Sequence, residues 1–551
     1  MREEQPTTAL EAGGRERAVA HEEGPLLVLG AAGTGKTELL ARRLARLAEH
    51  GVAPERVLVI GSTRATARRL RERSEALLQG PFEELWIGSW DAVGERLLRE
   101  RSEAAGLDPF FDVLGPAERL AMLLDRLAEL PLRRHEIRGN PAGLLARLLA
   151  RIDALKAERV GPTRLQERAQ EARAAADGEA ATEAAERELE FAELYATHDR
   201  ILAAAGSLDR ADVFLALDCL LTERADVRAQ IAGRFEHLMV DELEETTPAQ
   251  RSILAALAAE RPNHLYALEG ADGPGAWFRE LFPDGDAVVL ERRFREPAVR
   301  FWTCANERAQ AQAVAREVEH LLAGGTGPEQ ICVLVAEPGR HGGAVAAAME
   351  ERGIPFHLSG PVALFQRPEV RDAIAWLRVL ADPDDSAAAA RALTRPPVEL
   401  RSGDLARLTT IARRRKQDMV AACEAALDSP QFQPEARERI QAFLKLYNTA
   451  SRALEERRAD VFVRRLIEAV GLRRQRLFAA QPEVAERLLG LSRLAELATA
   501  WARREPHGST RGFVAYLSAV AEAGVEPDAG EEPPSPASVQ GMAVDAVKGL
   551  G

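Results

Sequence analysis

This 551-residue sequence lacks long apolar runs, paired cysteines and, almost entirely, lysine. No stretch of eighteen apolar residues occurs, and the opening residues 1–5 (MREEQ) carry no apolar segment, so we expect neither a membrane span nor a secretory signal. The four cysteines lie far apart without a C-x-x-C spacing, which argues against a zinc site, an iron–sulfur cluster or a disulfide framework. These absences predict a cytoplasmic protein.

Lysine is scarce because arginine supplies nearly all of the 73 basic residues, and the formal net charge is −13. This charge argues mildly against a general polyanion binder, so a nucleic-acid contact would need a local basic groove or backbone and helix-end donors. Where such a chain keeps lysine, the position needs a compact ammonium group, and this makes Lys36 the most informative residue. The five lysines are Lys36, Lys156, Lys416, Lys445 and Lys548.

The pattern of apolar residues predicts several domains, since single cores stop growing at about 250–300 residues. Short apolar runs alternate with helical patterns in two regions, which predicts an α/β fold with two parallel-sheet lobes, each carrying a mainly helical insertion. The second lobe is expected to contain strands at 288–290, 331–335 and 356–358. The predicted boundaries are 1–115 and 233–284 for the first lobe, 116–232 for its insertion, 285–385 and 539–551 for the second lobe, 386–523 for its insertion and 524–538 for a linker.

A glycine-rich segment at residues 30–37 has the pattern G-x-x-x-x-G-K-T, after an apolar run and before a helical pattern. The glycines let backbone N–H groups face phosphates, and the helix N-terminus adds partial positive charge. Lys36 is expected to reach the β- and γ-phosphates, and Thr37 to bind Mg²⁺. A glycine-rich turn that merely caps a helix is the competing interpretation. The predicted ATP-binding residues are Gly30, Ala31, Ala32, Gly33, Thr34, Gly35, Lys36 and Thr37.

Asp241 and Glu242 follow the apolar run 237–240. An Asp at the carboxyl end of a parallel strand beside a P-loop is placed to hold the Mg²⁺ shell. The neighbouring Glu is a candidate to orient or deprotonate the attacking water. Because Asp-Glu pairs after apolar runs are common, solvated loop acids are the competing interpretation.

Several segments resemble the UvrD/Rep/PcrA helicases, in the order in which that family has them. Residues 240–250 (VDELEETTPAQ) resemble motif II, V-D-E-F-Q-D-T-N-P-x-Q. The resemblance covers nearly the whole chain and is specific because several moderate motifs keep their order and spacing. The other matching segments are 57–67 (motif Ia), 87–93 (motif Ib), 290–295 (the L-x-x-N-Y-R motif), 353–377 (the approach to the second insertion) and 539–550 (motif V).

The resemblance implies two RecA-like lobes with ATP in their cleft and single-stranded DNA across their tops. It implies a 3′-to-5′ DNA helicase or translocase in repair or recombination. Arg295 would reach the γ-phosphate, completing a catalytic set with Lys36 and Glu242, and Phe294 would stack on adenine. A solvated arginine and an ordinary core phenylalanine are the competing interpretations.

DNA contacts are predicted at two kinds of residue. Aromatic rings near motifs Ib and III are candidate base-stacking platforms, worth about 1–3 kcal/mol per base, with core packing as the competing interpretation. Polar residues in motif Ia are candidate phosphate donors, with helix capping as the alternative. The stacking candidates are Trp90, Trp277 and Phe278, and the phosphate candidates are Ser62, Thr63 and Arg64. The basic residues 413–416 suggest a duplex or partner contact, or else a solvated helix face.

Departures from the family pattern keep a second hypothesis open. Arg15 stands where a glutamine reads adenine, Glu38 where an arginine packs on the base, and no Gln occurs in the motif III segment 268–279. Asp91 and Asp545 replace histidines near DNA, and motif VI is not reached, so we expect ATP–Mg²⁺ binding with slow hydrolysis. The alternative is a degenerate motor subunit of a RecB- or AddA/AdnA-like helicase–nuclease, which would have a partner subunit. A P-loop kinase or transport ATPase is disfavoured by the ordered helicase-like segments.

Overall fold

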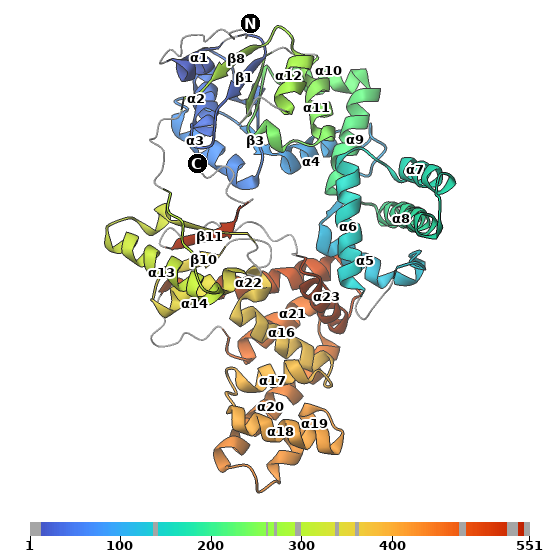
Figure 1. Ribbon diagram of the computed structural model, residues 1–551, viewed down its shortest axis with the longest axis vertical. Coiled ribbons are helices and arrows are strands. Elements are labelled where there is room, and N and C mark those ends of the chain that lie inside the picture. The colour runs from blue at the N-terminus through green and yellow to red at the C-terminus, as the bar shows by residue number, and fades with distance from the viewer. Residues whose placement is uncertain are drawn as a thin grey trace.

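The computed structural model describes residues 13–21, 23–135, 141–259, 263–268, 273–291, 299–336, 341–358, 363–472, 481–525 and 538–544. Figure 1 shows two sheet-containing lobes, each with a helical body beside it. The first lobe carries the helices α5 to α8 at its side, and the second lobe leads into the long helical body α16 to α23. This arrangement is the predicted one of two α/β lobes with helical insertions.

A six-stranded sheet with the order β3-β2-β6-β7-β1-β8 forms the first lobe, and all its strand pairs are parallel. Its strands are β1 (Leu26–Leu29), β2 (Val57–Gly61), β3 (Trp86–Ser89), β6 (His237–Val240), β7 (His264–Leu268) and β8 (Asp286–Val289). Its helices are α1 (Gly14–Ala20), α2 (Lys36–Glu49), η1 (Pro54–Arg56), α3 (Arg64–Leu77), α4 (Trp90–Glu100), α9 (Arg210–Glu223), α10 (Ala225–Arg234), η3 (Leu243–Glu245), α11 (Pro248–Ala258) and α12 (Pro274–Leu281).

Helices cover both faces of this sheet, which explains why its strands read as unbroken apolar runs. In β1, Leu26 and Val28 pack into the core under α2 and α3, whereas Leu27 packs into the core under α4, α9 and α11. Successive side chains point to opposite faces, so each face needs its own apolar set. Because all six strands are parallel, their carboxyl ends lie at one edge of the sheet, where the loops that follow the strands can form a site.

One predicted strand belongs to the other lobe. The run 288–290 was expected in the second lobe, but it contributes to β8, which pairs with β1 in the first sheet, Val288 lying opposite Val28. The predicted boundary at 284/285 is therefore wrong, and the first lobe continues through Val289. A short apolar run predicts a strand, but its neighbour in the sheet depends on residues far away in sequence.

Two short strands flank the first helical insertion in sequence, β4 (Asp112–Leu114) and β5 (Ser207–Asp209). They pair in parallel, and this two-stranded sheet was not predicted. The predicted insertion extends too far, because α9 and α10 pack into the core of the first lobe through Phe214, Leu217 and Ile231. Its remaining elements are α5 (Pro116–Asp125), η2 (Leu127–Glu129), α6 (Ala142–Ala157), α7 (Pro162–Ala174) and α8 (Glu179–Ala204).

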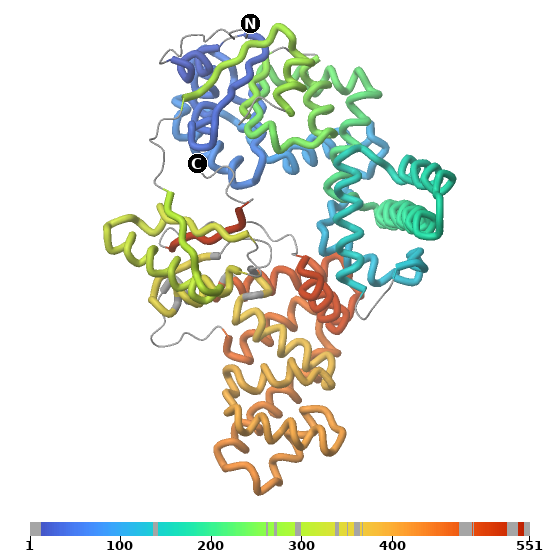
Figure 2. The backbone as a smooth tube through the Cα atoms, viewed as in Figure 1, coloured from blue at the N-terminus to red at the C-terminus, as the bar shows by residue number. Residues whose placement is uncertain are grey.

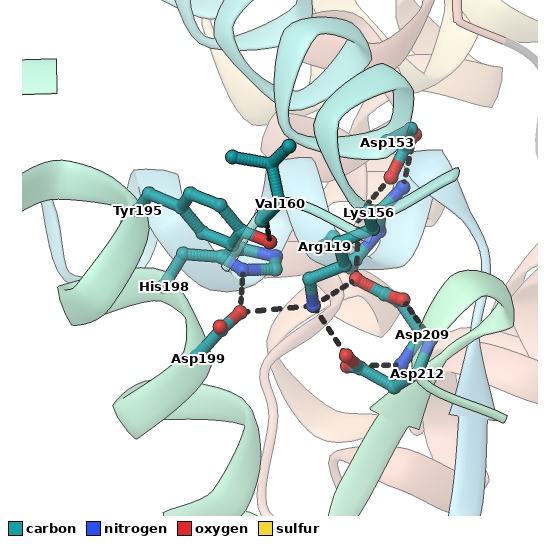
Figure 3. A network of polar contacts seen from close by, with 9 residues as sticks. All are labelled: Arg119, Asp153, Lys156, Val160, Tyr195, His198, Asp199, Asp209 and Asp212. Atoms are coloured by element: carbon teal, nitrogen blue, oxygen red, sulfur yellow. Dashed lines mark hydrogen bonds and ion pairs between the residues drawn. The ribbon is translucent and has the colours of Figure 1, made fainter. Parts of the chain in front are cut away.

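A buried ionic cluster ties this insertion to the base of α9 (Figure 3). Lys156 is 1% exposed, and its ammonium lies 2.9 Å from Asp199, 2.9 Å from Asp209 and 2.6 Å from Asp212. Arg119, also buried, pairs with Asp209 at 3.1 Å. The cluster thus joins α5, α6, α8 and the start of α9 through charged side chains that are paired with one another.

The second lobe is a three-stranded parallel sheet with the order β10-β11-β9. Its middle strand β11 comes from the far end of the chain, and Figure 2 shows this red segment returning to the lobe formed by residues before 360. The predicted interruption of this lobe by a helical insertion is therefore confirmed. The elements are α13 (Glu307–Ala323), η4 (Pro328–Gln330), β9 (Cys332–Val335), α14 (Gly343–Glu351), β10 (Phe356–Leu358) and β11 (Val539–Ala543).

The second helical body begins earlier than the predicted residue 386. Trp376 of α16 is 1% exposed and packs on Phe443 of α20, with ring centroids 5.3 Å apart. The body also touches the first insertion, where Arg504 pairs with Glu118 at 2.9 Å. No helix in the described part of the chain is long and apolar enough to cross a bilayer. The helices of the second helical body are α15 (Ala363–Gln366), α16 (Pro368–Ala381), α17 (Ser386–Thr394), α18 (Ser402–Arg415), α19 (Met419–Leu427), α20 (Pro434–Glu456), α21 (Ala459–Ala469), α22 (Gln481–Arg504) and α23 (Thr510–Ala523).

Candidate nucleotide site

The strand order brings the two predicted halves of the site together at the carboxyl edge of the first sheet. One strand, β7, separates β1, which leads into the glycine-rich loop, from β6, which ends before Asp241. The Thr37 hydroxyl at the start of α2 donates a hydrogen bond to Asp241 Oδ2 at 2.8 Å. Residues 204 positions apart in sequence are thus in direct contact.

The loop at 30–35 adopts a conformation that only glycine accommodates easily. Gly33 has φ +77° and Gly35 has φ +80°, in the left-handed region. At Gly30 a Cβ would lie 2.5 Å from Thr34 Oγ1, so a side chain there would displace the buried threonine. Thr34 in turn donates its hydroxyl to Ala31 O at 2.8 Å, which closes the loop on itself. The curled backbone and the N-terminus of α2 form a phosphate-binding arrangement.

Lys36 folds back over this loop. Its ammonium donates to Gly30 O at 2.6 Å and to Ala31 O at 3.4 Å. A charged phosphate oxygen is a stronger acceptor than a neutral carbonyl, so an incoming phosphate can take over these donors. The lysine is therefore held at the position where a phosphate would bind.

Asp241 is 1% exposed. Burial raises its pKa to about 6, although the hydrogen bond from Thr37 and the charge of Lys36 act in the opposite direction. A buried carboxylate beside a hydroxyl gives hard oxygen ligands, which suit Mg²⁺ when phosphate oxygens and water complete its shell. Thr37 and Asp241 together fit the predicted metal site.

Glu242 lies next to this pair in an unusual backbone conformation. Its φ is +51°, in the left-handed region that non-glycine residues rarely adopt. The Ser62 hydroxyl, in the loop after β2, donates a hydrogen bond to Glu242 Oε2. The candidate catalytic carboxylate is thus linked to the segment that was predicted to contact DNA.

Two departures from the family pattern flank the loop. Arg15 of α1 donates from Nη2 to Thr34 O, so its guanidinium lies against the glycine-rich loop. Glu38 is paired with Arg73 and Arg42, each at 2.7 Å, and the hydrogen bond from Arg73 is the main cause that lowers its pKa to about 2. The residues at the positions implied to contact adenine are therefore an arginine and an ion-paired glutamate.

Part of the motif II resemblance has a purely structural explanation. Thr247 caps α11 by accepting from Gln250 N at 3.3 Å, and the Gln250 side chain accepts from Thr247 N at 2.9 Å. This capping box satisfies backbone donors at the helix N-terminus. The T-x-x-Q end of the motif therefore positions α11 beside the acid pair.

The predicted phosphate donors share the same edge of the sheet. Thr63 caps α3 by accepting from Thr66 N at 3.0 Å, so the capping role applies to it. Arg64, the first residue of α3, is exposed. Ser62 precedes them and binds Glu242, as described above. The loop after β2 therefore presents an exposed cation and a helix N-terminus next to the nucleotide site.

The predicted stacking platforms are mostly core residues. Trp90 is 6% exposed and packs edge-on against Phe214, and Phe278 is 1% exposed and packs against Tyr266. Neither ring offers a free face to a base in this structure, so the stacking interpretation of both is corrected to core packing. Trp277 is half-buried, with its ring edge-on to Tyr266.

Other predictions fall outside the described residues. Arg295 and Phe294 lie in 292–298, the motif III loop lies partly in 269–272, and Asp545 and Lys548 lie in 545–551. The basic stretch 413–416 is described: it ends α18 and is exposed, as a solvated helix face would be.

Two contacts of the site region and one of the insertion were missed at the level of sequence. These are the bond from Ser62 to Glu242, the contact of Arg15 with the loop, and the buried cluster around Lys156. The scarcity of lysine was a usable signal for the last, since the argument applied to Lys36 holds equally for Lys156. For the other two, a lone Ser or Arg in the sequence gives no comparable signal.

A curled glycine-rich loop, a lysine over it and a carboxylate across one intervening strand define the first lobe as a P-loop nucleotide-binding domain. Comparison with family models makes this assignment specific. Residues 13–268 match the UvrD/REP helicase N-terminal domain, and residues 294–551 match the UvrD-like helicase C-terminal domain. The chain belongs to the UvrD/REP family of ATP-dependent DNA helicases.

Individual relatives agree with the family models. The chain is 25% identical to ATP-dependent DNA helicase UvrD1 of Mycobacterium tuberculosis over 542 residues, covering 88% of this chain and 67% of that protein. It is 25% identical to Rep of Escherichia coli, covering 74% and 64%, and 23% identical to PcrA of Bacillus subtilis, covering 69% and 54%. The chain thus spans about half to two thirds of the length of these relatives.

Proposed function

We propose that this chain is the ATP-driven motor of a helicase or translocase that moves 3′ to 5′ on single-stranded DNA in repair or recombination, engaging junctions between single and double strands. The observation that supports this most directly is the 2.8 Å hydrogen bond between Thr37 and Asp241, which joins the phosphate-binding loop to the acid pair. The direction, the DNA structure and the process derive from the family resemblance.

In the proposed mechanism, the loop N–H groups and Lys36 bind the β- and γ-phosphates of ATP. Thr37 and Asp241 would hold Mg²⁺, which neutralises developing charge on the phosphates when bound. Glu242 orients the attacking water and accepts its proton as the water oxygen bonds to the γ-phosphorus. The bond between that phosphorus and the β–γ bridging oxygen breaks in the same step, so that ADP leaves and inorganic phosphate is released. Arg295 and Phe294, outside the described residues, stay predicted contacts to the γ-phosphate and adenine.

DNA is proposed to cross the same edge of the sheet. The loop after β2 offers Ser62, the exposed Arg64 and the N-terminus of α3, a combination that suits phosphate oxygens. Thr63 is proposed to contribute mainly by capping that helix. Trp277 is the one aromatic candidate that stays in the proposal, because its ring is only half-buried.

The test is the ATP turnover of this chain with and without single-stranded DNA. Lys36→Ala should reduce DNA-stimulated turnover by at least about 100-fold, the loss typical of removing one preorganised charge stabiliser. Lys445→Ala, an equal change at an exposed lysine of α20, is the matched control and should leave turnover unchanged. Nucleotide binding without DNA-stimulated turnover would refute the motor and favour the degenerate-subunit hypothesis.

A further inference from the structure

We propose that Ser62 couples DNA binding to ATP hydrolysis by holding Glu242. Without DNA the Ser62 hydroxyl binds the Glu242 carboxylate, and a DNA phosphate at the loop after β2 takes over that hydroxyl and releases the carboxylate to the attacking water. This inference rests on the proposed function above, because it assigns Ser62 a positioning role in that reaction.

The sheet register places the two residues side by side. Strands β2 and β6 are parallel neighbours, with Ile60 opposite Val240, and Asp241 N donates to Ile60 O at 2.9 Å. Continuing this register by two residues brings Ser62 next to Glu242. The contact is therefore built into the pairing of two core strands and does not depend on a long, mobile side chain.

The backbone of Glu242 brings its carboxylate to this position. With φ +51° and ψ 56°, Glu242 adopts a left-handed conformation that the surrounding structure must impose. Its N–H donates to Asp241 Oδ1 at 3.1 Å, and its carboxylate accepts from Ser62. A general base held against β2 in this way is not free to follow the attacking water.

The hydroxyl of Ser62 has a single proton, so it can donate to one strong acceptor at a time. A DNA phosphate is charged and competes with the carboxylate for this donor. The exchange needs only a rotation of the Ser62 side chain, because no other bond in the contact has to break. DNA occupancy and release of Glu242 are thus mutually linked.

The surroundings of Ser62 direct an anion toward it. The first turn of α3 contains no acidic residue, and Arg64 is exposed there. Gly61 lets this turn approach the strand closely, since a Cβ on it would lie 3.0 Å from Ala67 N. A phosphate drawn to the helix N-terminus and Arg64 therefore arrives beside the Ser62 hydroxyl.

The first test measures DNA affinity without nucleotide, by fluorescence anisotropy of a labelled single-stranded oligonucleotide at fixed salt. Glu242→Ala should bind DNA about 10-fold more tightly than the unmodified chain, because it frees the Ser62 donor. In a Ser62→Ala background the same change should alter the Kd by less than about 2-fold. Equal tightening in both backgrounds would mean simple charge removal and would overturn the proposal.

The second test measures turnover of the full chain. Ser62→Ala should raise DNA-free turnover by about 10-fold, the factor that one hydrogen bond to a charged group supplies, and so reduce the stimulation by DNA. Ser62→Thr keeps the hydroxyl and should preserve the stimulation, and Ser451→Ala, an equal change on α20, should alter nothing.

The outcomes separate this inference from the proposed function. If Ser62→Ala only weakens DNA binding and leaves DNA-free turnover unchanged, Ser62 is a phosphate contact and the coupling is refuted, while the motor stands. If the unmodified chain neither binds single-stranded DNA nor responds to it, the proposed function fails and the coupling fails with it.

Discussion

Replacing Lys156 by methionine should destabilise the first helical insertion by about 3–5 kcal/mol, the loss typical of removing one partner from a buried ion pair. The Lys156 side chain is 1% exposed, its ammonium lies within 2.9 Å of three aspartates, and the Asp209 side chain is equally buried. Burial by itself raises the pKa of Asp209, but Lys156 and Arg119 outweigh it and lower that pKa. Without the lysine, Asp209 keeps only Arg119 and the backbone N–H of Asp212, which donates to its Oδ1 at 2.8 Å, among the stabilising contacts described here.

The loss of stability caused by Lys156→Met should depend on pH in a definite direction. In the variant, the lysine no longer offsets the burial of Asp209 and Asp212, so the pKa of each of these two carboxyls rises above its unfolded value. The folded state therefore takes up protons as the pH falls. The deficit relative to the unmodified chain should therefore be largest near pH 8 and shrink as the pH is lowered through those raised pKa values. A deficit that is constant with pH would contradict the electrostatic explanation.

Hydrogen exchange of the amides in α6 and α8 measures this local stability directly. A loss of about 3–5 kcal/mol corresponds to a fall in protection on the order of 10²–10⁴. Arg187→Ala is the control, since Arg187 and Glu183 form an exposed pair on α8 at 3.1 Å, worth at most about 0.5 kcal/mol. A Lys156→Met variant within about 1 kcal/mol of the unmodified chain at pH 7 would refute the reasoning.

Three further predictions concern the first lobe. Asp241→Asn should weaken Mg²⁺-dependent ATP binding at least about 10-fold in calorimetry. The same change should stabilise the nucleotide-free protein by up to about 3 kcal/mol at pH 8, because burial raises the pKa of Asp241 to about 6. A thermal unfolding midpoint below that of the unmodified chain would contradict this expectation. Burial lowers the pKa of His237 to about 4, so below pH 6.5 this histidine is protonated in the unfolded chain but stays neutral in the folded one. The free energy of unfolding in urea should therefore fall by about 2 kcal/mol from pH 6.5 to 5, and His237→Gln should abolish this loss. The Arg15 side chain has hydrogen-bond donors only, which suits guanine better than adenine. The resemblance implies that residue 15 faces the base, so Arg15→Gln should increase the preference for ATP over GTP in competition binding. An unchanged ratio of the two affinities would show that Arg15 does not contact the base.

The geometry of the candidate nucleotide site was largely predictable from the sequence because the conformation of its loop is determined locally. Glycine at 33 and 35 is needed for a backbone with positive φ, and Lys36 and Thr37 follow at fixed positions on the helix that this loop opens. Asp241 was predictable because the carboxyl ends of parallel strands share one edge of a sheet. The helical character of both insertions was also evident from residue periodicity.

The tertiary structure alone decided which strand pairs with which and which aromatic rings are covered. The run ending at Val289 pairs with β1, and Trp90 is buried by Phe214, a residue more than a hundred positions away. The bond between Ser62 and Glu242 likewise needs the pairing of β2 with β6. Local sequence encodes conformation through short-range sterics and hydrogen bonds, whereas burial and pairing depend on the folding of the whole chain.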